Sequence, residues 1–125
     1  MRVLDEMFLV VSDDERQTVL RLNGSHPVFA VHFPGMPITP GVCLVQMLGE
    51  LLSRHEGREL ELSRIVNLKF VQTVRPVAAA GGGADDGPLL TVSFSSVADT
   101  GEGLQAKGTI AAGGEVTTKF SLVFR

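Results

Sequence analysis

The feature that most constrains the fold is one apolar helical run in a sequence otherwise typical of strands and turns. Residues 42–52 are apolar on nearly every side, as in a helix that is buried all round. Thr39 is a good N-cap, Pro40 suits the first helical position, and Gly57 suits the C′ position. The sequence therefore predicts one buried helix over residues 40–55.

Six other segments are rich in apolar and β-branched residues and are bounded by turn formers, as strands are. They lie at residues 7–11, 18–22, 59–74, 89–97, 104–112 and 116–124. Because one helix cannot cover both faces of a sheet, we expect a curved antiparallel sheet wrapped around the helix, an α+β fold. The apolar alternation of the third segment breaks near Ser63 and Arg64, which indicates either a bulge there or the true start of the strand.

The length and charge of the chain limit its functions. The 125 residues favour a single domain over residues 1–125, with a flexible loop at about residues 78–88, AAAGGGADDGP. A formal net charge of -3 and the lack of a long Lys or Arg run disfavour nucleic-acid binding. The apolar runs are too short to span a membrane, and Asp5 and Glu6 interrupt any signal sequence. A single cysteine allows no internal disulfide, so we expect a cytoplasmic protein.

The segment just before the predicted helix, residues 25–39, is unusually rich in proline. Pro27, Pro34 and Pro37 each fix φ and remove an N–H donor, so the segment is expected to be stiff and irregular. Connections of this length are uncommon in compact domains unless they have a function. We interpret the segment as one that brings His32 to the start of the helix.

The junction between this segment and the helix resembles a known family. The sequence HFPGMPITPGV over residues 32–42 is similar to the motif of the hotdog-fold 3-hydroxyacyl-acyl-carrier-protein dehydratases, the FabZ/FabA type. A weaker similarity continues at Lys69-Phe70 and at Arg75-Pro76-Val77. The similarity in sequence is concentrated in residues 23–77, whereas the hotdog order of elements covers the whole chain.

The resemblance implies a dehydratase that converts a (3R)-3-hydroxyacyl thioester into the trans-2-enoyl thioester. It implies that His32 is the catalytic base and that the N–H groups of Gly41 and Val42 bind the thioester oxygen as charge develops on it. The substrate-binding residues that it implies are Phe33, Pro34, Gly35, Pro40, Gly41 and Val42.

The resemblance also implies which partners to expect. No metal or redox cofactor is expected. The substrate is expected to arrive on the phosphopantetheine of an acyl carrier protein or of coenzyme A. The expected assembly is a homodimer with active sites at the subunit interface, with a higher oligomer or a hetero-oligomer as further possibilities.

Three positions depart from the family pattern. Val31 replaces a glycine, Gln46 replaces the glutamate of the helix, and Ala78-Ala79 replaces a glycine-aspartate pair. Glutamine can hydrogen-bond the substrate hydroxyl but cannot protonate it, and general acid catalysis is typically worth ~10²–10⁴-fold in rate. The loss of this acid can be compensated in two ways. Either His32 returns the proton that it has taken to the leaving hydroxyl, or Glu50 acts as a catalytic group from one helical turn further along.

Simpler structural interpretations remain open for these helix residues. Gln46 and Glu50 share a narrow polar stripe with Gly49 and Ser53, and this stripe can be the solvated face of the helix, although Gly49 favours close packing. Cys43 is either an activated thiolate beside the histidine or a buried inert thiol.

Alternatives also remain for the surface charges and for the function. His55 is expected to be a surface residue that compensates the helix dipole. Arg54, Arg58, Arg64 and Arg75 either dock an acidic carrier or are scattered surface charges. One alternative function is a non-catalytic subunit of a hetero-oligomeric dehydratase, whose acid comes from a different hotdog subunit. The other is a hotdog thioesterase that hydrolyses the thioester with an activated water.

Overall fold

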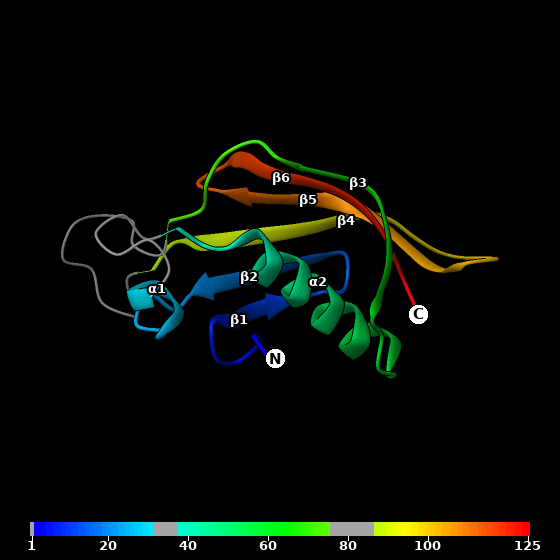
Figure 1. Cartoon of the computed structure of the whole chain (residues 1–125), viewed down its shortest axis with the longest axis horizontal. Helices are drawn as coiled ribbons and strands as arrows, with labels where there is room; N and C mark the ends of the chain where they lie inside the picture. The colour runs from blue at the N-terminus through cyan, green and yellow to red at the C-terminus, as the bar shows by residue number, and fades with distance from the viewer. Residues whose placement is uncertain (1, 32–37, 76–86) are drawn as a thin grey trace.

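The computed structural model describes residues 2–31, 38–75 and 87–125. Its elements are, in chain order, β1 (Phe8–Asp13), β2 (Gln17–Leu22), α1 (Val28–Val31), α2 (Gly41–Glu56), β3 (Leu62–Phe70), β4 (Leu89–Thr100), β5 (Gly103–Ala112) and β6 (Glu115–Phe124). The strands form a six-stranded antiparallel sheet in the order β1-β2-β4-β5-β6-β3. The sheet curves around α2, as Figure 1 shows, so the predicted α+β architecture is confirmed.

The core lies between α2 and the concave face of the sheet. The buried residues of α2 are Cys43, Leu44, Met47, Leu48, Gly49, Leu51 and Leu52. They pack with strand residues that are themselves almost wholly buried, among them Leu20, Leu90, Val92, Ile110, Leu122 and Phe124. A Cβ atom at Gly49 would lie 3.1 Å from Cε1 of Phe124, so this glycine lets β6 approach the helix closely. The close packing predicted for Gly49 is therefore confirmed.

The start of α2 differs by one residue from the prediction. Pro40 is the N-cap, with extended backbone and no side-chain capping bond, so the predicted cap at Thr39 is wrong. Thr39 is buried instead, and its N–H donates to the carbonyl of Val74 at 2.6 Å. Tertiary burial has therefore overridden the local capping preference of threonine. Gly57 does end the helix, in the left-handed conformation with φ 70°.

β3 and β4 differ most in length from the prediction, and part of the irregular segment is helical. β3 covers Leu62–Phe70, not residues 59–74. The break near Ser63 and Arg64 therefore lies at the start of the strand, and the pairing with β6 also shifts there, between Leu62 and Arg64. β4 continues to Thr100 because its hairpin with β5 extends beyond the body of the sheet. α1 places one helical turn inside residues 25–39. Most of the flexible loop expected at 78–88 lies outside the described residues.

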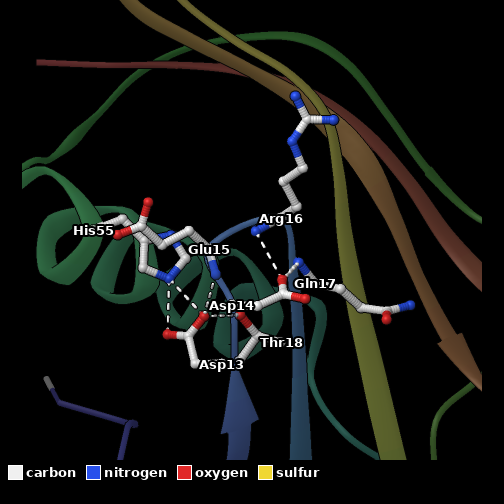
Figure 2. A network of polar contacts seen from close by, with 7 residues as sticks. All are labelled: Asp13, Asp14, Glu15, Arg16, Gln17, Thr18 and His55. Carbon is white, nitrogen blue, oxygen red and sulfur yellow. Dashed lines mark hydrogen bonds and ion pairs between the residues drawn. The ribbon is translucent and has the colours of Figure 1, made fainter.

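His55 is not the surface residue that the sequence suggests. Its side chain is only 9% exposed, and its Nε2 lies 2.8 and 3.0 Å from the two carboxylate oxygens of Asp13 (Figure 2). The imidazole ring also meets the ring of Phe94 edge-on, at a centroid distance of 6.0 Å. This contact joins the last turn of α2 to the end of β1, a pairing across 42 residues that no local pattern predicts.

The same network stabilises the ionised form of Asp13. Partial burial, the strongest single influence, acts to raise the pKa of Asp13. Hydrogen bonds from the Glu15 N–H, from His55 and from the Thr18 hydroxyl together outweigh it and hold the pKa below its ordinary value of 3.8. Asp13 therefore contributes stability as a carboxylate.

Candidate functional site

The predicted site residues fall into two groups. His32, Phe33, Pro34 and Gly35 lie outside the described residues. The other predicted residues, Pro40, Gly41, Val42, Gln46 and Glu50, lie at the start of α2 and along one of its sides. The geometry of the candidate site is therefore that of the helix start and of this side.

The start of α2 offers hydrogen-bond donors that the helix itself does not use. The N–H groups of Cys43 and Leu44 make the first bonds of the helix, both to the carbonyl of Pro40, at 3.0 and 3.3 Å. The N–H groups of Gly41 and Val42 precede these bonds and so have no acceptor within the helix. Val42 is 70% exposed. Together with the positive end of the helix dipole, these donors suit a negatively charged oxygen.

The ring of Phe70, the last residue of β3, lies beside these donors. A Cβ atom at Gly41 would lie 2.7 Å from Cζ of Phe70, so glycine allows the ring to lie directly on the helix start. Phe70 itself is 48% exposed, and the chain that follows it returns to the helix through the bond between Val74 and Thr39. The weak sequence similarity at Lys69-Phe70 therefore coincides with a residue that frames the helix start.

Gln46 and Glu50 are joined to each other rather than left free. The Gln46 Nε2 donates to Oε2 of Glu50 at 2.9 Å, and Gln46 is exposed. The Glu50 carboxylate also accepts the backbone N–H groups of Val3, at 2.9 Å, and Leu4, at 2.9 Å. Val3 and Leu4 are each only 1% exposed. Glu50 thus binds the N-terminal segment to the middle of α2, a role that sequence reasoning missed because the partners are 46 and 47 residues away.

An open groove runs beside this pair. It has a volume of about 730 Å³, and Gln46, Glu50, Ser53, Arg54 and Leu60 are among its lining residues. Water can therefore reach the outer side of the Gln46–Glu50 pair.

The remaining candidates fit the structural interpretations. Cys43 is buried, and this burial raises the pKa of its thiol, which favours the inert interpretation. Arg54 pairs with Asp5, Arg64 pairs with Glu102 at 2.8 Å, and Arg58 lies 3.9 Å from Asp99. Three of the four arginines considered for carrier docking are therefore engaged within the chain.

Two observations limit the chemistry within the described ranges. Residues 2–31, 38–75 and 87–125 contain no group of three or more His, Cys, Asp or Glu side chains placed to hold a metal ion. In the same ranges, no helix has both the length and the apolar character needed to cross a membrane.

Comparison with known proteins identifies the family. Residues 10–80, more than half of the chain, match the model of the ApeI-like family, described as ApeI dehydratase. The chain belongs to the ApeI-like dehydratase family. The matched region contains both the segment around His32 and the whole of α2.

Relatives with assigned names agree with this family. A 3-hydroxyacyl-[acyl-carrier-protein] dehydratase FabZ of Caldicellulosiruptor saccharolyticus is 25% identical over 98% of this chain and 85% of the relative. The enzyme of the same name from Clostridium acetobutylicum is 27% identical over 78% of this chain and 67% of the relative. The predicted similarity to the FabZ type is therefore confirmed.

Solved structures confirm the hotdog fold of this dehydratase-family chain. The dehydratase heterocomplex ApeI:P from Xenorhabdus doucetiae contains a chain that superposes with a TM-score of 0.68 at 13% identity, covering 94% of this chain and 96% of that one. An uncharacterized protein from Erwinia carotovora subsp. atroseptica superposes with a TM-score of 0.60 at 18% identity, covering 95% and 94%.

Proposed function

We propose that this chain dehydrates a (3R)-3-hydroxyacyl thioester, carried on an acyl carrier protein, to the trans-2-enoyl thioester. The observation that most supports this is the start of α2. There, two N–H donors without helical acceptors, those of Gly41 and Val42, lie beside the ring of Phe70. The family match and the names of the FabZ relatives support the substrate class.

In this reaction His32 removes the proton from C2 of the substrate. The thioester oxygen gains negative charge as the C2–H bond breaks, and the N–H groups of Gly41 and Val42 stabilise that charge. The C3–O bond then breaks, the C2–C3 double bond forms, and the hydroxyl leaves as water after His32 returns its proton. The amide of Gln46 hydrogen-bonds the 3-hydroxyl but exchanges no proton with it.

We assign Glu50 to the architecture of the site rather than to proton transfer. Its carboxylate is already bonded to two backbone N–H groups and to Gln46. A carboxylate that releases these partners to protonate a substrate leaves the Val3 and Leu4 donors without an acceptor.

A second candidate function is a subunit of a hetero-oligomeric dehydratase. Two observations favour it: a glutamine stands where the family has the helix glutamate, and the similar ApeI:P structure is a heterocomplex. β3 also forms an edge of the sheet and carries exposed large apolar side chains, namely Leu62, Ile65, Val66 and Phe70. An exposed apolar edge of this kind calls for a second subunit, a copy of this chain or a different hotdog chain.

The test uses thioesters of N-acetylcysteamine, which need no carrier. Hydration of the enoyl thioester and dehydration of the 3-hydroxyacyl thioester are measured on the wild type, His32→Ala and Gln46→Glu. The proposal expects wild-type turnover that His32→Ala abolishes. A silent wild type that Gln46→Glu activates supports the subunit function, and release of free thiol from acyl thioesters supports a thioesterase instead.

A further inference from the structure

The convex face of the sheet, on the side away from α2, collects all three lysines of the chain. Lys69 lies on β3, Lys119 on β6 and Lys107 on β5, which are neighbouring strands (Figure 1). All three are exposed, while residues next to them in sequence, such as Phe120 and Ala106, are buried in the core. Since side chains alternate along a strand, the lysines project from the opposite face.

The pairing register brings the lysines close together. Lys69 and Lys119 are direct partners across β3 and β6. Lys119 pairs with Thr109 on β5, and Lys107 lies two residues from Thr109. With strands about 4.8 Å apart, the three positions span roughly 10 Å across the sheet. We call Lys69, Lys107 and Lys119 the lysine face.

No acidic side chain neutralises the lysine face within the described residues. β3 and β5 contain no Asp or Glu, and the only acid of β6 is Glu115 at its first position, where Gln72 binds it. The ion pairs found in residues 2–31, 38–75 and 87–125 all use arginine or histidine. Like charges directly opposite each other in a sheet are destabilising, so the Lys69–Lys119 pair does not stabilise the isolated chain.

We propose that the lysine face is the docking surface for the acidic surface of the acyl carrier protein. This inference rests on the proposed function and names the partner surface of the same site. Three lysines over roughly 10 Å match a small acidic patch, whereas a chain with net charge -3 and no longer basic run is poorly suited to an extended polyanion.

The lysine face lies close to the candidate site. Lys69 is the next-to-last residue of β3, and the residue after it, Phe70, lies on Gly41 at the start of α2. A phosphopantetheine arm from a carrier bound here passes around the end of the strand to reach the donors of Gly41 and Val42. This arrangement also assigns the docking charges to residues other than the ion-paired Arg54, Arg58 and Arg64.

The test compares a lysine variant with a charge-matched control. Lys69→Gln/Lys119→Gln removes two positive charges from the lysine face, and Arg16→Gln/Arg58→Gln removes two elsewhere. Arg16 lies in the turn between β1 and β2, at the other end of the sheet order from β3 (Figure 2). Binding of a holo acyl carrier protein with a fluorescent label on its phosphopantetheine arm is measured by anisotropy at low and at high salt.

We expect the lysine variant to bind the carrier roughly tenfold more weakly at low salt, with the difference shrinking at high salt. KM for carrier-bound substrate should rise by a similar factor, while kcat and the kinetics on the N-acetylcysteamine thioester stay unchanged. Thermal unfolding of the lysine variant should occur at or above the wild-type temperature, because a like-charge pair is removed.

Three results would overturn the docking proposal: no carrier binding by the wild type, wild-type affinity in the lysine variant, or equal weakening in the control. If a low concentration of inorganic phosphate also displaces the carrier from the wild type, the lysine face is a general anion site instead. A wild type that does not turn over the N-acetylcysteamine thioester would refute the proposed function. The binding measurement would still test the docking surface independently.

Discussion

Replacing Glu50 with alanine tests whether this carboxylate is an anchor or a chemical group. The change removes the acceptor of the Val3 and Leu4 N–H groups and the partner of Gln46. Hydrogen bonds to charged groups contribute about 1.5–3 kcal/mol each. Because the neighbouring groove of about 730 Å³ admits water, we take the lower end of that range for the two backbone donors. The free energy of unfolding should therefore fall by about 2–4 kcal/mol.

Two further substitutions should destabilise the protein less than Glu50→Ala does. Glu50→Gln keeps one oxygen for the Leu4 N–H but turns an NH₂ group toward the Val3 N–H, so a loss of about 1 kcal/mol is expected. Gln46→Ala removes an exposed partner and leaves both backbone bonds, so it should cost less than either. The expected order of destabilisation is Glu50→Ala, then Glu50→Gln, then Gln46→Ala.

Urea denaturation followed by circular dichroism gives the free energy of unfolding of each variant. The slope of this free energy against urea concentration should be the same in all of them. Turnover is measured on the same samples under conditions where each is folded. An alanine variant with wild-type stability would refute the anchor. Unchanged stability combined with lost turnover would assign Glu50 to the chemistry.

Three further predictions concern packing, pH and reactivity. Gly108→Ala should prevent folding, because its Cβ would lie 2.0 Å from the carbonyl oxygen of Ser93, while Gly101→Ala, with nothing within 4 Å, should fold normally in the same expression and melting assay. Asp13→Asn should lower stability at neutral pH. Because the pKa of Asp13 in the folded protein is below 3.8, the difference in the free energy of unfolding between the variant and the wild type should persist above pH 3.8. It should vanish as the pH falls through the folded pKa, and a difference that does not change with pH would contradict this. Cys43 should react with iodoacetamide far more slowly in the folded protein than in urea, and equal rates would show that the thiol is accessible.

Much of the fold could be predicted because its signals are local. The apolar run of the helix and the glycine at its end each act within a few residues, and the structure has α2 and its left-handed Gly57 as expected. The family motif before α2 likewise lies in one continuous stretch. The N-cap is at Pro40 rather than at Thr39 because Thr39 is buried, a long-range effect that local sequence does not show.

The parts of the site that could not be predicted depend on contacts between distant segments. Glu50 and Gln46 can be assigned to one side of a helix from their spacing, but the N-terminal backbone that Glu50 binds lies 46 and 47 residues earlier in the chain. His55 has the sequence context of a surface residue, and only the approach of the end of β1 buries it against Asp13.

Local sequence patterns are sufficient to predict one buried helix, the strands that surround it, and a proline-rich segment that carries a histidine and leads into the helix. Helical periodicity, strand alternation and proline geometry are properties of short segments, so they can be read without the fold. The contacts between distant residues depend on the tertiary structure. It placed Phe70 on Gly41, engaged Glu50 with the N-terminal backbone, and set Lys69 opposite Lys119, because strand order and register, not local sequence, choose those neighbours.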